Sequence, residues 1–369
     1  MNRLHTLTRP ALFWAAALFT VVASSAELLK PREVDAIASA PPDRTLAYGS
    51  DPNQFGQLFL PKGKGPFAVA VVLHGGCWKK FADLKNTLPM SDALRNAGIA
   101  VWNIEYRRVD NEGGGWPGTY LDVGAAIDYL RTIAGEYQLD LRQVITVGHS
   151  AGGHLALWAA GRHRLAKNSP LYVKDPLRIH AVVNLAGPGR LQSLSDQQQK
   201  KVCGSVPVTQ LLGSEIDQVP QRLHDGSPAE MLPLGVPQIL ITGSLDWLVP
   251  PALGEEYATL ARKSGDEAQM TVIDGAGHFE VIAPGTAAWP TVEKAVLSLV
   301  TVARSRPPGD SSTECCSLSA APRLRVTPCR QFSLALALLL ALARVHRLGS
   351  FPSWRARARA SSRAREGGR

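Results

Sequence analysis

Six short apolar runs recur along the chain between residues 67 and 273. Each run is apolar throughout instead of alternating with polar positions, a pattern typical of parallel strands that are covered on both faces. The predicted strands are residues 67–73, 98–104, 143–148, 179–185, 237–242 and 269–273.

Segments with helical spacing lie between these strands. Residues 119–134 place their apolar side chains on one stripe of a helix. In the first helical segment, Pro89 is expected to mark a helix start or a kink. Strands that alternate with helices predict an α/β fold, a doubly wound and mostly parallel sheet with helices on both faces. The predicted helices are residues 83–97, 119–134, 151–163, 252–264 and 291–302.

Residues 186–235 interrupt the alternation of strands and helices. This stretch is polar, rich in Gln and punctuated by Pro and Gly. Long insertions that leave a sheet at the carboxyl ends of its strands commonly cover a site there. We therefore expect a small cap insertion over about residues 186–235.

The strongest chemical signal is the pentapeptide GHSAG, which follows the predicted strand at 143–148 and opens the helix at 151–163. A strand–turn–helix of this kind is a nucleophile elbow, a turn so tight that the residues two before and two after the Ser need to lack side chains. Gly148 and Gly152 meet that need. Ser150 is the predicted nucleophile. The alternative interpretation is an unreactive, Gly-rich helix start.

A second motif, HGGCW, comes directly after the strand at 67–73. Gly75 and Gly76 leave their backbone N–H groups free to face an anionic oxygen, and the N–H of Ala151 completes a predicted oxyanion hole. His74 precedes this loop, so we interpret it as a residue that fixes the loop by hydrogen bonds.

The general base is expected late in the chain, after its acid partner. His278 lies in the glycine-flanked loop GAGHF that follows the last predicted strand. Asp246 follows the strand at 237–242 and gives the order Ser, Asp, His. Asp274 is the rival acid, but it lies only four residues before His278 in the same turn. The predicted triad is Ser150, Asp246 and His278.

Residues 50–302 resemble an α/β-hydrolase serine esterase. HGGCW, GHSAG, SLDWLVP and GAGHF together are similar to the feruloyl-esterase-like and arylformamidase group, whose oxyanion loop reads HGGxW. The hormone-sensitive-lipase-like group is a neighbouring match, but it prefers a third Gly where this chain has Cys77. It also prefers a Tyr-Arg-Leu-Ala-Pro stretch where this chain has EYRR at 105–108. The resemblance implies the same triad and adds the N–H of Cys77 to the oxyanion donors.

The predicted function is hydrolysis of small or aryl carboxylic esters through an acyl-enzyme on Ser150, with no metal and no organic cofactor. The alternatives are an arylformamidase-type amide hydrolase and a non-catalytic binding protein of the same fold. Trp78, Trp116 and Trp247 fall in loops near strand ends, where they could form an aromatic wall for a small-molecule substrate. Ordinary packing of these Trp residues is the competing interpretation.

The charge of the chain is concentrated at one end. The net charge of the 369 residues is +9, and residues 303–369 carry 13 Arg and three acids, which is +10. The remaining 27 basic and 28 acidic residues leave −1, so no nucleic-acid partner is expected. We interpret residues 303–369 as a disordered or non-native tail; a membrane- or polyanion-binding tail is the alternative.

Residues 1–26 have the pattern of a cleavable secretory signal. Arg3 and Arg9 form a positive segment before an apolar run at 11–23, and small residues lead up to Ala26. The run is shorter than the ~20 residues that span a bilayer, which favours cleavage over stable membrane insertion. The catalytic domain is then expected at residues 27–302, in the periplasm or secreted.

The catalytic domain has two cysteines, Cys77 and Cys203, and no metal-binding spacing such as CxxC. A disulfide between them and two free buried thiols are both compatible with the sequence.

Overall fold

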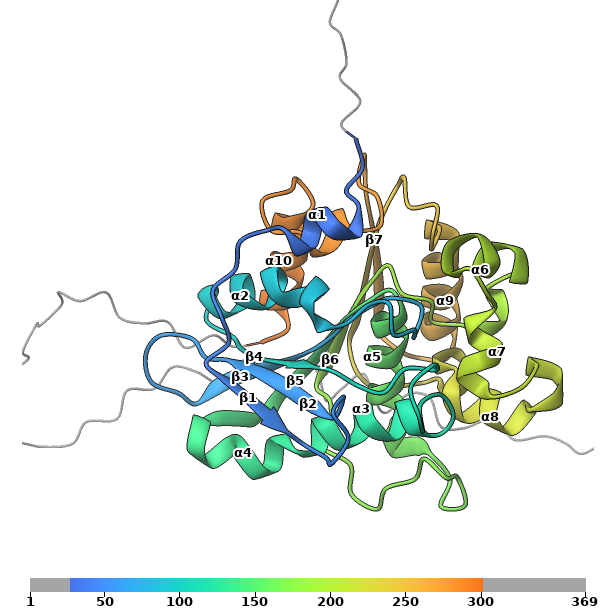
Figure 1. Ribbon diagram of the computed structural model, residues 1–369, viewed down its shortest axis with the longest axis horizontal. Helices are drawn as coiled ribbons and strands as arrows, with labels where there is room; N and C mark the ends of the chain where they lie inside the picture. Colours follow the sequence, from blue (N-terminus) through green and yellow to red (C-terminus); the bar gives the residue numbers. More distant parts are fainter. Residues whose placement is uncertain (1–26, 301–369) are drawn as a thin grey trace, which may run out of the picture. The chain divides into compact units, whose positions relative to one another are not determined.

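The computed structural model describes residues 27–300, which form an eight-stranded sheet with strand order β1-β2-β4-β3-β5-β6-β7-β8 (Figure 1). β1 pairs with β2 and β2 pairs with β4 in antiparallel fashion, and every other neighbouring pair is parallel. The structure therefore confirms the predicted doubly wound, mostly parallel sheet. The strands are β1 (Arg44–Ala47), β2 (Phe55–Phe59), β3 (Phe67–Leu73), β4 (Ala100–Ile104), β5 (Leu139–His149), β6 (Ala181–Leu185), β7 (Gln238–Gly243) and β8 (Ala268–Ile273).

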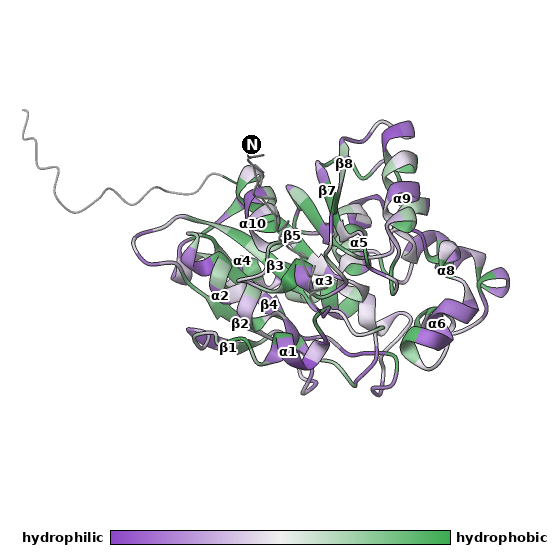
Figure 2. Cartoon of the chain, turned by 90° about the horizontal axis from the view of Figure 1, so that it is seen from above, coloured by the Kyte–Doolittle hydropathy of each residue, from purple (hydrophilic) through white to green (hydrophobic). Residues whose placement is uncertain are grey.

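Helices cover both faces of the sheet. Alternate residues of the central strands point to opposite faces, so their side chains are buried in two separate cores. In β3, Val69 and Val71 belong to one core and Ala70 and Val72 to the other. The first core contains α3 (Gly118–Asp128), α4 (Leu130–Tyr137), α5 (Ala151–Gly161) and α9 (Pro251–Lys263). The second contains α1 (Pro31–Asp35), α2 (Leu88–Asn96) and α10 (Trp289–Ser298). Figure 2 shows the apolar strands enclosed between these helices.

The helices differ from the predictions at several boundaries. The predicted helix at 119–134 divides at Tyr129, which ends α3 and precedes α4. The predicted helix at 83–97 begins as a 3-10 turn over Leu84–Thr87, and Pro89 occupies the first turn of α2, as predicted for a helix start. α10 begins and ends earlier than the predicted segment at 291–302.

The insertion at 186–235 folds into a group of short helices, α6 (Asp196–Cys203), α7 (Pro207–Leu212) and α8 (Pro220–Gly226). These helices lie together beside α9 at one side of the sheet (Figure 1). The two cysteines of the domain meet here: Cys77, in the loop after β3, forms a disulfide with Cys203 at the end of α6, with a Cα–Cα distance of 6.0 Å. The structure thereby selects the disulfide over two free thiols.

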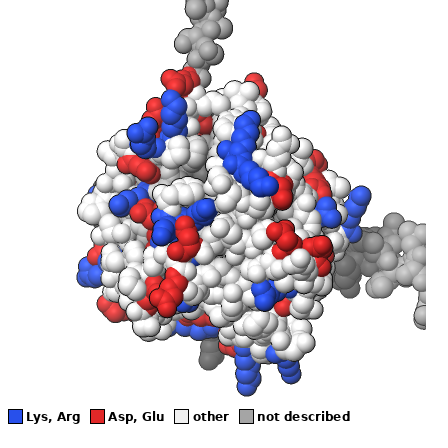
Figure 3. All heavy atoms as spheres, turned by 45° about the vertical axis from the view of Figure 1, so that its right-hand side comes forward, with Lys and Arg blue, Asp and Glu red and all other residues white. Residues whose placement is uncertain are grey.

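Acidic and basic side chains are interspersed on the face shown in Figure 3, in line with the near-neutral charge of residues 1–302. None of the helices within residues 27–300 is both long and apolar enough to cross a membrane. The predicted secretory signal at 1–26 and the Arg-rich segment at 303–369 lie outside the described residues.

Candidate active site

Ser150 occupies a strained turn between the end of β5 and the start of α5. Its φ of 53° and ψ of −120° lie in a region that residues with side chains rarely adopt. The turn is closely packed on both sides: a Cβ on Gly148 would lie 2.1 Å from the carbonyl oxygen of Gly152, and one on Gly152 would lie 2.2 Å from that of Leu73. Only glycine fits these two positions, as the nucleophile-elbow prediction requires.

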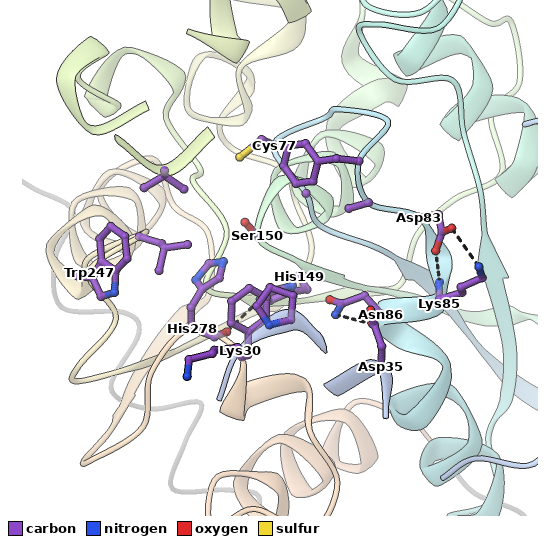
Figure 4. Close-up of a pocket in the computed structure, with 17 residues that line it drawn as sticks. Lys30, Asp35, Cys77, Asp83, Lys85, Asn86, His149, Ser150, Trp247 and His278 are labelled. Carbon is purple, nitrogen blue, oxygen red and sulfur yellow. Dashed lines mark hydrogen bonds and ion pairs between the residues drawn. The ribbon is translucent and has the colours of Figure 1, made fainter. Parts of the chain in front are cut away.

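Asp246 and His278 meet above the carboxyl ends of β7 and β8. Nδ1 of His278 donates to Oδ2 of Asp246 at 2.7 Å, and both side chains are buried. Oδ1 of Asp246 accepts the backbone N–H groups of Leu248 and Val249 at 2.9 Å each, which holds the carboxylate in place. Because Nδ1 is occupied, Nε2 is the imidazole nitrogen that remains for a reacting group. Figure 4 shows the imidazole beside the hydroxyl of Ser150.

The rival acid has a different environment. Asp274 is exposed, and its Oδ1 accepts a hydrogen bond from the hydroxyl of Ser244 at 3.2 Å. That contact turns the carboxylate toward the turn after β7, so Asp246 is the acid that holds His278.

The loop after β3 lies directly against Ser150. A Cβ on Gly75 would lie 3.0 Å from the Cβ of Ser150, and Gly76 has a φ of +101°. Cys77 follows with a φ of 56°. Gly76 and Cys77 line the same cavity as Ser150, and Cys77 also lines a second pocket together with Ser150 and Ala151, the first residue of α5. The four predicted oxyanion donors therefore lie close to Ser150 or line the cavities beside it, and their role as donors stays a prediction.

A buried network fixes this oxyanion loop. Nε2 of His74 contacts Oε1 of Glu105 at 3.0 Å, and Nδ1 contacts the carbonyl oxygen of Gly75 at 2.8 Å. The hydroxyl of Tyr106 donates to the carbonyl of His74 at 2.8 Å, and its ring stacks on the imidazole. Burial by itself would raise the pKa of Glu105, but His74 and Arg108 outweigh it and keep this pKa below its usual value. His74 thus has the predicted structural position, and Glu105 is a supporting residue that the motifs did not identify.

His149, which precedes Ser150, connects the elbow to the loop of the base. Its Nε2 donates to the backbone carbonyl of His278 at 3.0 Å. Burial, together with the nearby imidazole of His278, lowers the pKa of His149 well below its usual value. His149 is therefore neutral, with its proton on Nε2.

A cavity of about 570 Å³ opens above Ser150 and His278. Its lining combines polar and apolar side chains, and Figure 4 shows Asp35, Asp83, Lys85 and Asn86 on the opposite side of Ser150 from Trp247. A second pocket of about 40 Å³ also borders Ser150 and is almost entirely apolar. Besides Ser150, His149 and His278, the polar side chains that line the large cavity are Lys30, Asp35, Asp83, Lys85 and Asn86.

The three predicted tryptophans have different environments. Trp247 is half-exposed and lines the large cavity, and Trp78 is buried and lines the small pocket. Trp116 lines neither of these two cavities and instead packs against Tyr120 with ring centroids 5.6 Å apart. Its loop packs on the cap, because Gly115 lies against the backbone of α7. For Trp116 these contacts favour the competing interpretation of ordinary packing.

Two parts of the cavity wall were not identified from the sequence. Phe81 is two-thirds exposed and lines the cavity from the loop after β3. Lys30 and Asp35 reach it from the region of α1, far from every motif in the sequence. An aromatic residue three positions after HGGCW is the sequence feature that could have identified Phe81.

A sheet of this strand order, with a tight Ser-bearing turn after its central strand, defines an α/β-hydrolase. Residues 57–260, more than half of the chain, match the BD-FAE family model. The chain belongs to this family of α/β-hydrolase esterases.

Related proteins agree with this fold. The chain is 24% identical over 245 residues to a probable isoprenylcysteine alpha-carbonyl methylesterase, ICME, of Oryza sativa subsp. japonica, a match that covers 64% of this chain and 58% of that relative. A truncated carbohydrate esterase from gut microbiota superposes with a TM-score of 0.55 at 21% identity, covering 69% of this chain and 94% of that one. An arylesterase structure superposes with a TM-score of 0.58 at 20% identity, covering 73% and 89%.

Proposed function

We propose that this protein hydrolyses carboxylic esters through an acyl-enzyme on Ser150. The observation that carries the proposal is one cavity that contains Ser150 and His278, with His278 held at Nδ1 by the buried carboxylate of Asp246. A nucleophile, a base and an orienting acid in this order are the parts that acyl transfer requires. Membership of an esterase family supports the ester as the bond that is cleaved.

The reaction follows from the positions of these groups. Nε2 of His278 takes the proton of Ser150 as the hydroxyl oxygen attacks the carbonyl carbon, and Asp246 stabilises the imidazolium that results. The negative oxygen lies against the N–H groups of Gly76, Cys77 and Ala151. The imidazolium then gives its proton to the leaving alcohol. Water, deprotonated by the same imidazole, attacks the acyl-enzyme and regenerates Ser150.

The two cavities favour a short acyl group and a larger alcohol. The apolar pocket of about 40 Å³ beside Ser150 has room for an acyl group of only a few atoms. The large cavity combines polar side chains such as Asp83, Lys85 and Asn86 with the aromatic rings of Phe81 and Trp247. Such a surface fits an alcohol that carries hydroxyl groups or an aromatic ring, and the carbohydrate esterase and arylesterase among the related structures support this choice.

We further propose that the protein acts outside the cytosol. The pattern of residues 1–26 supports export. The disulfide between Cys77 and Cys203 suits an oxidising compartment, in which such bonds persist. Mass spectrometry of the protein recovered from the medium or periplasm tests the proposed export. A mass that corresponds to cleavage near Ala26 is expected, and the mass of a chain with an intact N-terminus would contradict the proposal.

A hydrolysis panel tests the proposed function. Wild type and Ser150→Ala are compared on p-nitrophenyl esters of short and long acids, a feruloyl ester, an acetylated sugar and N-formylkynurenine. Short-chain esters are expected to be cleaved by wild type only. Full activity in Ser150→Ala would contradict the mechanism, and a preference for the formamide over every ester would identify an arylformamidase instead.

A further inference from the structure

The disulfide lies in the wall of the candidate active site. Cys77 lines both the large cavity and the small apolar pocket, and Cys203 lines the small pocket. Cys77 is also one of the proposed oxyanion donors through its backbone N–H, and it holds an uncommon positive φ of 56°. One covalent bond therefore connects the oxyanion loop to the end of cap helix α6, across 126 residues of sequence.

Helix α6 also contacts the loop that carries the acid. The side-chain amide of Gln198 donates to the carbonyl oxygen of Leu248 at 2.8 Å, two residues after Asp246. The ammonium group of Lys201 lies 4.8 Å from the centre of the Trp247 ring, a cation–π contact. α6 thus bridges the oxyanion loop at its C-terminal end and the acid loop along its length.

The helix has little hydrophobic burial of its own to keep it there. Of its eight residues, DQQQKKVC, only Gln199 is buried. Apolar burial is the main force that holds a surface helix on a domain, so the position of α6 depends on specific contacts. These are the contacts just described and the two hydrogen bonds by which Gln199 holds the helix to Leu194 and Val208 of the cap. Besides the disulfide, the oxyanion loop and the segment after α6 are joined by a hydrogen bond of 3.1 Å from Lys79 to Ser205.

We infer that Cys77 and Cys203 are positioning residues for the ester hydrolysis, and that their disulfide sets the length limit of the acyl group. The inference rests on the proposed function. With the bond intact, α6 closes the small pocket next to Ser150, and the N–H of Cys77 stays aimed at the oxyanion. Without it, α6 can move away from the oxyanion loop, which enlarges the acyl pocket and loosens one oxyanion donor.

The test compares the full-length wild type with Cys77→Ser/Cys203→Ser on p-nitrophenyl acetate, butyrate and hexanoate. In the double variant we expect the hexanoate-to-acetate ratio of kcat/KM to rise at least tenfold. The kcat for acetate is expected to fall about tenfold, part of the 10²–10³ that complete loss of an oxyanion donor costs. A loss of stability alone would lower both rates together and leave the ratio unchanged.

Dithiothreitol provides the matched control. It transfers two electrons and two protons to the disulfide, which becomes two thiols, and is itself oxidised to a cyclic disulfide. Reduced wild type is expected to reproduce the ratio of the double variant. The reductant is expected to change nothing further in the double variant, which excludes an effect through Cys315, Cys316 or Cys329.

A second variant keeps the disulfide and removes the hydrogen bond between α6 and the acid loop. Gln198 also lines the small pocket, so the variant is Gln198→Met, which removes the amide donor and keeps the length of the side chain. It is expected to raise the same ratio at least threefold, and this measurement decides the question if the double variant does not fold. An unchanged ratio in Gln198→Met, or in verified disulfide-free protein, would overturn the inference. A wild type inactive on every ester would instead refute the proposed function, so the two failures are distinguishable.

Discussion

The close packing around the Ser150 turn can be tested with a single methyl group. In Gly152→Ala the new Cβ would lie 2.2 Å from the carbonyl oxygen of Leu73 and 2.4 Å from that of His74. Both oxygens belong to the backbone of β3 and the oxyanion loop, so neither can rotate away. Ordinary contact begins at 3.4 Å, so the start of α5 and the end of β3 need to separate by about 1.2 Å.

A separation of this size acts on stability and on catalysis together. Overpacking of a close-packed site typically destabilises a protein by about 1–3 kcal/mol. A displacement of about 1 Å at reacting groups costs about 100-fold in rate. We therefore expect Gly152→Ala to lower the free energy of unfolding by about 3 kcal/mol and kcat/KM for p-nitrophenyl acetate by about 100-fold.

The matched control is Gly135→Ala in α4, where a new Cβ would meet nothing within 4 Å. In that helix Ala is expected to stabilise the protein by about 0.4–1 kcal/mol and to leave hydrolysis unchanged. Urea unfolding followed by circular dichroism and steady-state hydrolysis measure the two effects. Equal stability and equal activity in the two variants would refute the steric account of the elbow.

Three further predictions concern the groups around the elbow. Asp246→Asn is expected to lower kcat about 10⁴-fold in steady-state kinetics. The control Asp274→Asn is expected to lower kcat less than about threefold. Comparable losses in the two variants would contradict the choice of Asp246 as the acid. Glu105→Gln is expected to lower kcat about tenfold with KM little changed, because it weakens the contacts that hold the oxyanion loop; an unchanged kcat would contradict this. His154 is fully buried in α5, one turn after Ser150, and its Nε2 contacts the carbonyl oxygen of Gly226 at 2.8 Å. Burial lowers the pKa of His154 to about 4, below its unfolded value of 6.5. The unfolded chain therefore binds the extra proton, and stability falls as the pH drops from about 6.5 to 4. Between pH 7 and pH 4.5 this proton uptake lowers the free energy of unfolding by about 2 kcal/mol. In His154→Gln, which has no group to titrate at this position, urea unfolding is expected to show a decrease that is smaller by this amount.

The order of the elements and the positions of the chemical motifs could be predicted because both depend on local sequence. All six apolar runs became strands of the parallel part of the sheet. The antiparallel strands β1 and β2 were missed: β1 is mostly exposed and β2 is only partly buried, so neither carries a continuous apolar run. The break at Tyr129 was also missed, because the apolar stripe continues across it.

The walls of the site were harder to predict, because they are assembled from distant segments. Cys77 and Cys203 lie 126 residues apart, and no local pattern indicates that the cap returns to the oxyanion loop. Trp116 and Trp247 both occupy loops near strand ends, but only the second loop faces the cavity. Glu105 lies in a stretch that the motifs used only to separate related families, and its role becomes visible through its contact with His74.

The most direct test of the central claim is to label the nucleophile. Diethyl p-nitrophenyl phosphate reacts with an activated serine, whose oxygen bonds to phosphorus as p-nitrophenolate leaves. We predict one equivalent of p-nitrophenolate per protein, complete loss of esterase activity, and a diethylphosphoryl group on the peptide that contains Ser150, located by mass spectrometry. An adduct on a different residue, or full activity after stoichiometric labelling, would contradict the assignment of Ser150 as the nucleophile.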